Sequence, residues 1–338
     1  MAIRIYMGCK MWRLPGEFEQ HRATWISWPC RKSIWPDIAA TCKAYAAVVN
    51  AVAEGEPVNV LVAPSDVMLA KKLCSQVGVT FIPVAGDDSW ARDTLPTFVV
   101  TQQAVGAVNW NFNAWGEKFF PFENDRLLGQ KVIEYVQRDQ AITVFEPGLV
   151  LEGGAIHSNG AGLLVTTKQA LLNPNRNGNL ALADMQAALE KYFHVQNIVW
   201  LEQGLIEDLD TDGHVDNVMC FADKDTVLMQ VFNADDQNHA IFKDNLKALQ
   251  ALSEVVCLHQ PEPVYLNGER LALSYANSYV ANCAVIIPSF KQKKIDEAVY
   301  HIFKERCPGR DIIQIEALDI LVGGGGIHCI TMQEPKSV

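Results

Sequence analysis

The sequence predicts a mixed α/β fold built from five similar units arranged in a ring. Residues capable of chemistry recur at a spacing near 60: Glu152 follows Asp93 by 59 residues, and His214 follows Glu152 by 62. Cys329 follows His214 by 115 residues, nearly two such spacings, and the segment LSYANSY lies close to the halfway point. A fixed period of this length is typical of repeat architectures.

Each unit is expected to contain two short strands and an amphipathic helix. The segments HSNGAGLLV and CFADKDTVLM place a polar or glycine turn between two apolar runs, as β-hairpins do. Helical periodicity follows in residues 126–139, 180–193, 240–252 and 294–306. The N-terminal part fits the same pattern, with a strand at 23–29, a helix at 37–54 and a strand at 58–64.

Units of this size cannot each bury a core, so they are expected to stack around a common centre. A strand at residues 320–322 is expected to lead into the glycine run before Cys329. The final strand, that of Cys329, is followed by no helix, and we expect it to close the ring beside the strand at 23–29. This gives one domain over residues 1–338.

Composition excludes several classes of function. The net charge is −11, from 28 Lys and Arg against 39 Asp and Glu, which disfavours nucleic acid and anionic membranes and favours a small cationic partner. We expect no membrane segment, because no stretch approaches the ~20 apolar residues that a spanning helix needs. The nine cysteines form no C-x-x-C pair, and the first twenty residues resemble no signal peptide, which predicts free thiols in the cytoplasm.

The motif GGGGIHC, ending at Cys329, bares the backbone beside a thiol, and G-G-x-I-H recurs at residues 153–157. A lone Cys329 could be a buried apolar residue, and a lone His214 a structural histidine. His214 and Asp216, if on one strand, point the same way and could also be a metal pair. These alternatives weaken because such residues recur at one position of the repeat.

The set suits one kind of chemistry. A cysteine and a histidine supply a nucleophile and a proton carrier. Carboxylates in one pocket repel each other unless a cation lies between them, and a guanidinium is the cation that donates paired hydrogen bonds to carboxylates. Its central carbon would then be open to a thiolate from one face.

The chain resembles the agmatine deiminases of the guanidine-modifying superfamily, which includes arginine and peptidylarginine deiminases. The resemblance covers nearly the whole chain and is carried by these motifs: WRLPGEFEQHRATWISWP, DDSWARDTLPTF, NWNFNAWG, LEGGAIH, LLNPNRN, TDGHVDN and GGGGIHCITMQ. It implies a five-bladed, pseudo-symmetric α/β propeller of the pentein type. It departs from the family pattern at Gly326, where relatives usually carry Asn, so we expect Gly326→Asn to keep or raise activity.

The resemblance also implies roles for individual residues. Cys329 would be the nucleophile and His214 the general acid and base, with Glu152 supporting His214 and the substrate nitrogens. Asp93 and Asp216 would grip the guanidinium, and Trp90 and Trp115, otherwise simple core aromatics, would line the substrate channel. No metal or organic cofactor is implied.

The implied reaction converts agmatine to N-carbamoylputrescine and ammonia through a covalent amidino-thioether on Cys329, in polyamine biosynthesis or agmatine catabolism. Two alternatives remain open: a deiminase of free arginine or peptidylarginine, and a weakened protein that only binds guanidines. For an arginine carboxylate, Arg176 is a candidate partner, while the acidic run at 207–212 favours an ammonium. A homodimer is expected from base rates.

Overall fold

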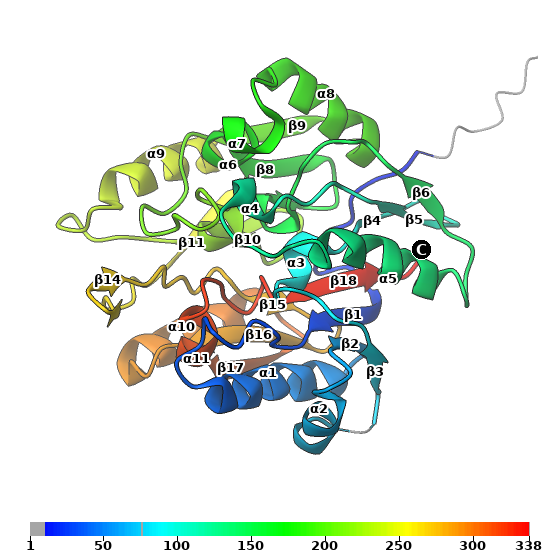
Figure 1. The fold of residues 1–338 in the computed structure, drawn as a ribbon. Helices are drawn as coiled ribbons and strands as arrows, with labels where there is room; N and C mark the ends of the chain where they lie inside the picture. The colour runs from blue at the N-terminus through cyan, green and yellow to red at the C-terminus, as the bar shows by residue number, and fades with distance from the viewer. Residues whose placement is uncertain (1–10, 76, 338) are drawn as a thin grey trace, which may run out of the picture.

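The computed structural model describes residues 11–75 and 77–337, within which the strands form five sheets of three or four strands and one short hairpin (Figure 1). The four-stranded sheet has the order β18 (Thr331–Pro335), β1 (His21–Ser27), β2 (Val58–Val62) and β3 (Val79–Pro83). The three-stranded sheets are β4 (Thr97–Val100), β5 (Val105–Val108) and β6 (Thr143–Phe145); β7 (Ile156–Ser158), β8 (Leu163–Thr167) and β9 (Asn197–Leu201); β10 (Met219–Phe221), β11 (Thr226–Gln230) and β12 (Glu254–Leu258); and β15 (Tyr279–Val280), β16 (Ala284–Ser289) and β17 (Asp311–Glu316). The hairpin is β13 (Tyr265–Leu266) with β14 (Glu269–Arg270).

The five sheets share one topology. In each, a first strand pairs antiparallel with a second, and the second pairs parallel with a third. Parallel neighbours need a crossover, and a helix provides it each time. These crossover helices are α1 (Ile38–Ala53), α5 (Leu128–Val136), α8 (Leu182–Phe193), α9 (His239–Gln250) and α10 (Lys293–Arg306). The predicted mixed α/β class is confirmed.

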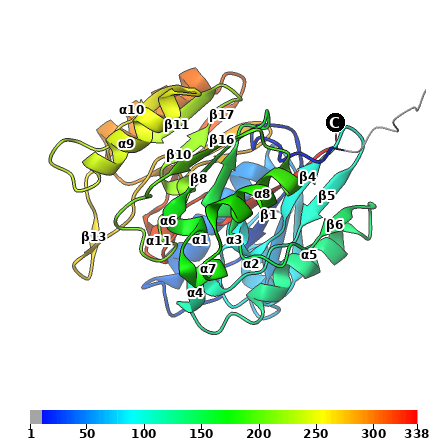
Figure 2. The ribbon, with the colours of Figure 1, turned by 90° about the horizontal axis from the view of Figure 1, so that it is seen from above.

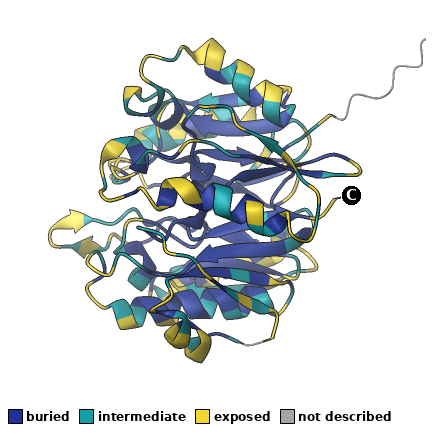
Figure 3. Cartoon of the chain, turned by 45° about the vertical axis from the view of Figure 1, so that its right-hand side comes forward, coloured by how far each residue is buried: buried dark blue, intermediate teal, exposed yellow. Residues whose placement is uncertain are grey.

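The two ends of the described chain meet in the four-stranded sheet. There β18 takes the place of the first strand and pairs antiparallel with β1, with Met332 opposite Trp25. The first strands also contact one another, β18 lying beside β4 and β7 beside β10. Seen from above, α9 and α10 lie on one side and α5 on the opposite side, with strands between them (Figure 2). The strands are mainly buried, and most exposed residues lie on the outer helices, the loops and the hairpin of β13 and β14 (Figure 3).

Short helices lie in the connections, and three of them meet in the interior. They are α2 (Val67–Leu73), α3 (Ala91–Thr94), α4 (Ala114–Glu117), α6 (Lys168–Leu171), α7 (Pro174–Asn177), α11 (Leu318–Leu321), and the 3₁₀ turns η1 (Asp125–Leu127), η2 (Gly153–Ala155) and η3 (Val215–Asn217). Helix α3 packs on η2 and on β18, and η2 packs on η3. Among the described residues, no helix has the length and apolarity to cross a membrane.

Three expectations about local structure are wrong. Cys329 lies in a turn two residues before the final strand, β18, and not within that strand. Residues 318–321 form helix α11 and not a strand, since a short apolar run suits either state and this one packs against α1. His214 and Asp216 are not strand neighbours: η3 begins after His214, whose backbone N–H donates to Asp208 Oδ2 at 3.0 Å. The first ten residues, which were part of the signal-peptide expectation, lie outside the described residues.

Candidate active site

The candidate site is built from the residues that precede the first strand of several sheets. These are Asp93 in α3 before β4, Glu152 before η2 and β7, His214 and Asp216 around η3 before β10, and Cys329 before β18. Because the units share one topology, a common position in the unit brings these residues to a common region of the fold. The packing of α3, η2, η3 and β18 on one another places them there.

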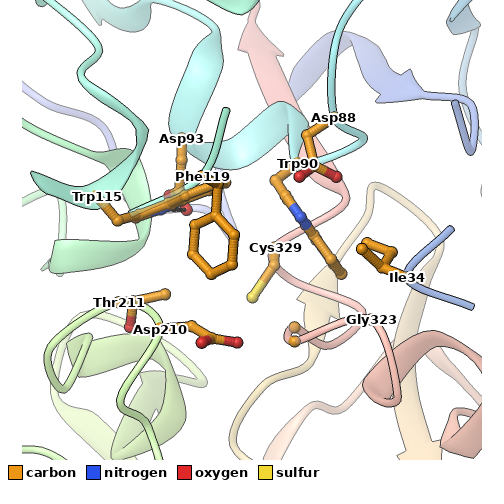
Figure 4. A pocket seen from close by; sticks show the side chains of 12 residues that line it. Ile34, Asp88, Trp90, Asp93, Trp115, Phe119, Asp210, Thr211, Gly323 and Cys329 are labelled. Carbon is orange, nitrogen blue, oxygen red and sulfur yellow. Dashed lines mark hydrogen bonds between the residues drawn. The ribbon is translucent and has the colours of Figure 1, made fainter. Parts of the chain in front are cut away.

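A cavity opens beside Cys329, as the close-up in Figure 4 shows. Trp90, Trp115 and Phe119 form its aromatic walls, and residues 323–325 of the glycine run form part of its lining. Cys329 is 5% exposed, and its sulfur points into the space flanked by Phe119. The thiol therefore lines an aromatic pocket.

Three titratable side chains meet at Gly154. A Cβ added to this glycine would lie 2.6 Å from His214 Nδ1, 2.9 Å from Asp216 Oδ2 and 3.0 Å from Asp93 Oδ1. No larger residue fits without displacing all three. Both ring nitrogens of His214 and Oδ1 of Asp216 are buried and have no hydrogen-bond partner among the described residues. Since buried polar atoms are normally hydrogen-bonded, these atoms are suited to contact a bound polar molecule.

Asp93 is held in place by two donors. Its Oδ2 accepts a hydrogen bond from Trp115 Nε1 at 2.9 Å, and its Oδ1 accepts one from the backbone N–H of Gly154 at 2.9 Å. Oδ2 also lies 3.9 Å from His214 Nδ1. Burial raises the pKa of Asp93; the His214 ring opposes the shift, and the charge of Asp216 adds to it. Trp115 thus orients a carboxylate as well as lining the cavity.

Asp216 belongs to a buried chain of charges. Its Oδ2 lies 2.9 Å from His328 Nδ1, and His328 Nε2 lies 2.9 Å from Glu17 Oε2, which also accepts from Arg92 Nη2 at 2.8 Å. Burial opposes ionisation of Asp216, yet the hydrogen bond and charge of His328 lower the pKa of Asp216. Burial and Arg92 also oppose the imidazolium of His328, but Glu17 and Asp216 raise the pKa of His328. This chain keeps Asp216 negatively charged.

The same carboxylates act against the thiolate. Burial raises the pKa of the Cys329 thiol well above its usual range, and the charges of Asp216 and Asp93 raise it further. The Sγ atom lies 3.5 Å from Asp216 Oδ2. A backbone hydrogen bond at Gly326 and the side chain of Asn277 lower the pKa of the thiol. A bound cation between the carboxylates would shift this balance toward the thiolate.

Glu152 and Arg176 form a buried pair beside the cavity. Arg176 Nε donates to Glu152 Oε1, and both side chains are at most 1% exposed. Glu152 Oε2 has no partner among the described residues. The remaining nitrogens of Arg176 bind Asp212 Oδ2 and the carbonyl oxygens of Trp115 and Thr211. The guanidinium of Arg176 is therefore committed within the protein and does not suit a substrate carboxylate.

Only part of the acidic run at 207–212 faces the cavity. Asp210 and Thr211 line it, while Asp208 turns inward and accepts hydrogen bonds from Thr211 and His214. Burial raises the pKa of Asp210, with the charge of Asp208 adding to the shift. Asp88 lines the cavity as well.

One group of residues near the site has the composition of a metal centre. Glu17, His157 and His328 present ligand atoms within 4.8 Å of one another. Both nitrogens of His328 already contact carboxylates, and Arg92 contacts Glu17. Burial, and then the charge of His328, lower the pKa of His157 to about 3. These contacts describe an ion-pair network of Glu17, Arg92 and His328. The neutral ring of His157 stacks on the ring of His328, with the ring centroids 5.3 Å apart.

Sequence reasoning missed several residues around the thiol. Asn277 contacts Cys329 Sγ, and Glu17 and His328 hold Asp216. Two signals were present: Asn277 lies in the segment at the fifth repeat position, and His328 ends one of the two G-G-x-I-H motifs.

The structure places Cys329, Asp93, Trp90 and Trp115 on one cavity, with His214 and Asp216 around Gly154.

Comparison with known proteins gives consistent relatives. The sequence matches the Porphyromonas-type peptidyl-arginine deiminase family over residues 13–335. It is 35% identical over 355 residues to an agmatine deiminase of Pseudomonas aeruginosa, covering 96% of this chain and 95% of the relative. The solved agmatine deiminase of Enterococcus faecalis superposes with a TM-score of 0.90 at 28% identity, covering 97% of this chain and 96% of that one. A C. jejuni agmatine deiminase with Ser replacing a Cys and with substrate bound superposes with a TM-score of 0.89 at 28% identity, covering 96% and 97%.

Proposed function

The chain belongs to the Porphyromonas-type peptidyl-arginine deiminase family, and we propose that it hydrolyses agmatine to N-carbamoylputrescine and ammonia. The observation that carries this proposal is the meeting of Asp93, His214 and Asp216 around Gly154, beside a cavity that Cys329 lines. Two carboxylates, an unpartnered imidazole and a thiol are the groups that deimination of a guanidinium requires.

In the proposed reaction, Asp93 and Asp216 hold the guanidinium by charge-assisted hydrogen bonds. The Cys329 thiolate attacks the guanidinium carbon and forms a C–S bond. His214 donates a proton to one nitrogen, the C–N bond breaks and ammonia leaves. An amidino-thioether cation remains on Cys329.

Water completes the cycle. His214, now neutral, takes a proton from water as the oxygen attacks the same carbon. The C–S bond breaks and restores the thiolate, while the oxygen gives up its remaining proton to solvent and becomes the carbonyl of the ureido product, which leaves. The sum is agmatine plus water giving N-carbamoylputrescine plus ammonia, with no electron transfer. In this scheme Glu152, paired with Arg176, positions neighbouring residues and contacts substrate only through its free Oε2.

The cavity supports agmatine over free arginine. Its lining includes Asp93 and Asp210, together with Asp88, whose carboxylate is paired with Arg31 at 3.0 Å, and no lysine or arginine is among the described lining residues. A carboxylate near such groups is repelled, whereas a terminal ammonium is attracted. Arg176 is already bound to Glu152 and Asp212. The aromatic walls and the buried position of Cys329 favour a narrow substrate over a peptide.

We extend the proposal to the architecture and the setting of the protein. The shared topology of the sheets and the pairing of β18 with β1 support a five-bladed ring as one domain over residues 1–338. A cytoplasmic role in polyamine or agmatine metabolism, with a homodimer as the assembly, accompanies the proposed reaction.

A substrate panel scored by ammonia release tests the proposal. Agmatine, free arginine and an N-acylated arginine amide are compared at matched low concentrations. We expect agmatine to exceed arginine by ~10²-fold or more in kcat/KM, which corresponds to about 3 kcal/mol of discrimination. Equal rates on agmatine and arginine would contradict the substrate assignment, preference for the blocked arginine would favour a peptidylarginine deiminase, and binding without ammonia release would favour a guanidine-binding protein.

A further inference from the structure

The fifth repeat unit, like the others, provides a polar residue shortly before its first strand. Asn277 lies two residues before the start of β15, just as Cys329 lies two residues before the start of β18. It is 2% exposed, and its Nδ2 lies 3.3 Å from Cys329 Sγ. The nearby Tyr275 points elsewhere, since its hydroxyl donates to Asp296.

We propose that Asn277 is a further catalytic residue, whose amide N–H donates a hydrogen bond to the Cys329 thiolate and stabilises it before attack. The proposal rests on the proposed role of Cys329 as nucleophile. This hydrogen bond from Asn277 would help the Cys329 thiol to ionise although carboxylates surround it.

Both ends of the amide lie near the sulfur, Nδ2 at 3.3 Å and Oδ1 at 3.7 Å, and the surrounding network fixes Nδ2 as the nearer end. Asn277 Oδ1 accepts the backbone N–H of His328 at 2.9 Å, so Nδ2 must take the other direction. That nitrogen donates to Asn217 Oδ1 at 3.0 Å, and Asn217 Nδ2 in turn donates to the Asp208 carboxylate at 3.0 Å. Because a carboxylate only accepts when ionised, the orientation of Asn217 is fixed too. One N–H of Asn277 is used by Asn217, and the second is directed at Sγ.

The charges around the sulfur make such a donor necessary. The titratable groups acting on the thiol are Asp216 at η3, Asp93 on α3 and Tyr45 on α1, and His214 acts on both aspartates. The carboxylates disfavour the thiolate. The groups that favour it are the backbone at Gly326 and the amide of Asn277.

Gly326 provides the space for this amide. A Cβ at Gly326 would lie 2.3 Å from Asn277 Oδ1 and 2.8 Å from its Cγ. The backbone at Gly326 does not require a positive φ, which in this run occurs at Gly324. The glycine is therefore required for room, and any side chain there would move Asn277 away from its present contacts.

The test measures thiol reactivity without substrate. The full-length wild type, Asn277→Ala, Asn277→Asp and Ser278→Ala are treated with iodoacetamide between about pH 6 and pH 10, and alkylation of the Cys329 peptide is followed by mass spectrometry. In this reaction the thiolate sulfur bonds to the CH₂ carbon and iodide leaves. Ser278 is the matched control, because it is the buried neighbour of Asn277 but contacts Cys220 and the carbonyl of Ala276.

We expect Asn277→Ala to lower the rate of Cys329 alkylation near neutral pH ~10-fold, because loss of the hydrogen-bond donor raises the pKa of the thiol. Asn277→Asp should shift the profile further, since it removes the donor and adds a negative charge. Ser278→Ala should follow the wild type. Alkylation of the exposed Cys257 and Cys283 in each variant checks that the fold is intact.

A profile of Asn277→Ala that superimposes on the wild type would overturn the proposal, as would alkylation of Asn277→Asp that is no slower than that of Asn277→Ala, since a purely structural role does not depend on the added charge. If Asn277→Ala does not fold, the first of these criteria applies to Asn277→Asp. The assay contains no agmatine, so a shifted profile together with no ammonia release would contradict the proposed reaction while leaving the role of Asn277 standing.

Discussion

Asp216→Asn is the substitution whose two consequences separate substrate binding from thiol activation. The change keeps the size of the side chain and removes its charge. Asp216 is 1% exposed; Oδ2 contacts His328, and Oδ1 has no partner among the described residues. In the proposed complex, Oδ1 accepts from the substrate guanidinium, so the charge lost is one that faces a buried cation.

The size of the binding effect follows from burial and pairing. Two unit charges about 4 Å apart interact by ~4 kcal/mol at an effective dielectric constant near 20. Removing one partner of a buried, hydrogen-bonded pair costs ~2–5 kcal/mol. Taking ~3 kcal/mol, kcat/KM for agmatine should fall ~150-fold.

The effect on the free thiol has the opposite sign. The Asp216 carboxylate lies 3.5 Å from Cys329 Sγ and raises the pKa of the thiol. Without that charge the pKa of the Cys329 thiol falls and a larger fraction is thiolate, so Asp216→Asn should react faster than the wild type with neutral iodoacetamide near neutral pH. A damaged site would instead lose both activities.

Two assays on the same preparation measure this pair of changes: ammonia release from agmatine at concentrations below KM, and alkylation of the Cys329 peptide without substrate. Asp93→Asn is the companion variant, since Asp93 also raises the pKa of the thiol but accepts from Trp115 and Gly154. An unchanged kcat/KM in Asp216→Asn would refute the assignment of Asp216 to the guanidinium. A slower alkylation would refute the electrostatic argument.

Other variants test the remaining roles. Cys329→Ser should bind agmatine and lose almost all turnover, and acid quench of the wild type should trap an adduct on the Cys329 peptide; appreciable turnover by the serine variant would remove Cys329 as nucleophile. His214→Ala should lose ~10²–10⁴-fold in kcat, the usual range for general acid–base catalysis, and a loss below tenfold would assign the proton to another group. Gly326→Asn should lose activity with the fold retained, because its Cβ would meet Asn277, and equal or higher activity would show that Asn277 can move without cost. Burial opposes ionisation of Glu17, but the charges of His328 and Arg92 outweigh burial and lower the pKa of Glu17. The stability that Glu17 contributes is therefore present above its unfolded pKa of ~4.3 and is lost as the pH falls through its native pKa. Glu17→Gln should therefore lose less stability than the wild type between about pH 5 and pH 3 in urea unfolding, and equal losses would contradict the pairing.

The periodic features of the sequence predicted the structure best. Residues 126–139 were expected to be helical and contain α5, and residues 294–306, also expected to be helical, lie wholly within α10. In both cases a helix covers one face of a sheet, so the apolar spacing reports the burial directly. The mixed α/β class follows from the same alternation of strands and helices.

Local geometry at the site was less predictable, because it depends on contacts between units. His214 and Asp216 share a side of the chain in a strand, but the actual turn is set by Asp208, which accepts the backbone N–H of His214. Residues 318–321 read equally as strand or helix until their packing against α1 is known. The expected benefit of Gly326→Asn conflicts with the position of Asn277, which lies 49 residues earlier in the sequence. None of these contacts leaves a periodic signal.

The carboxylates that would bind the substrate cation also disfavour the Cys329 thiolate, and binding of that cation would remove this effect. Asp93 and Asp216 raise the pKa of Cys329 in the free site, and Asn277 and the backbone at Gly326 only partly offset this. A guanidinium held by the two carboxylates neutralises the charges that disfavour the thiolate. Linkage is reciprocal: if the bound cation favours the thiolate by some factor, the thiolate strengthens cation binding by the same factor. In the proposed enzyme the thiol is thus most reactive when the carbon that it attacks is already in place, and a neutral molecule that enters the cavity gains no such activation.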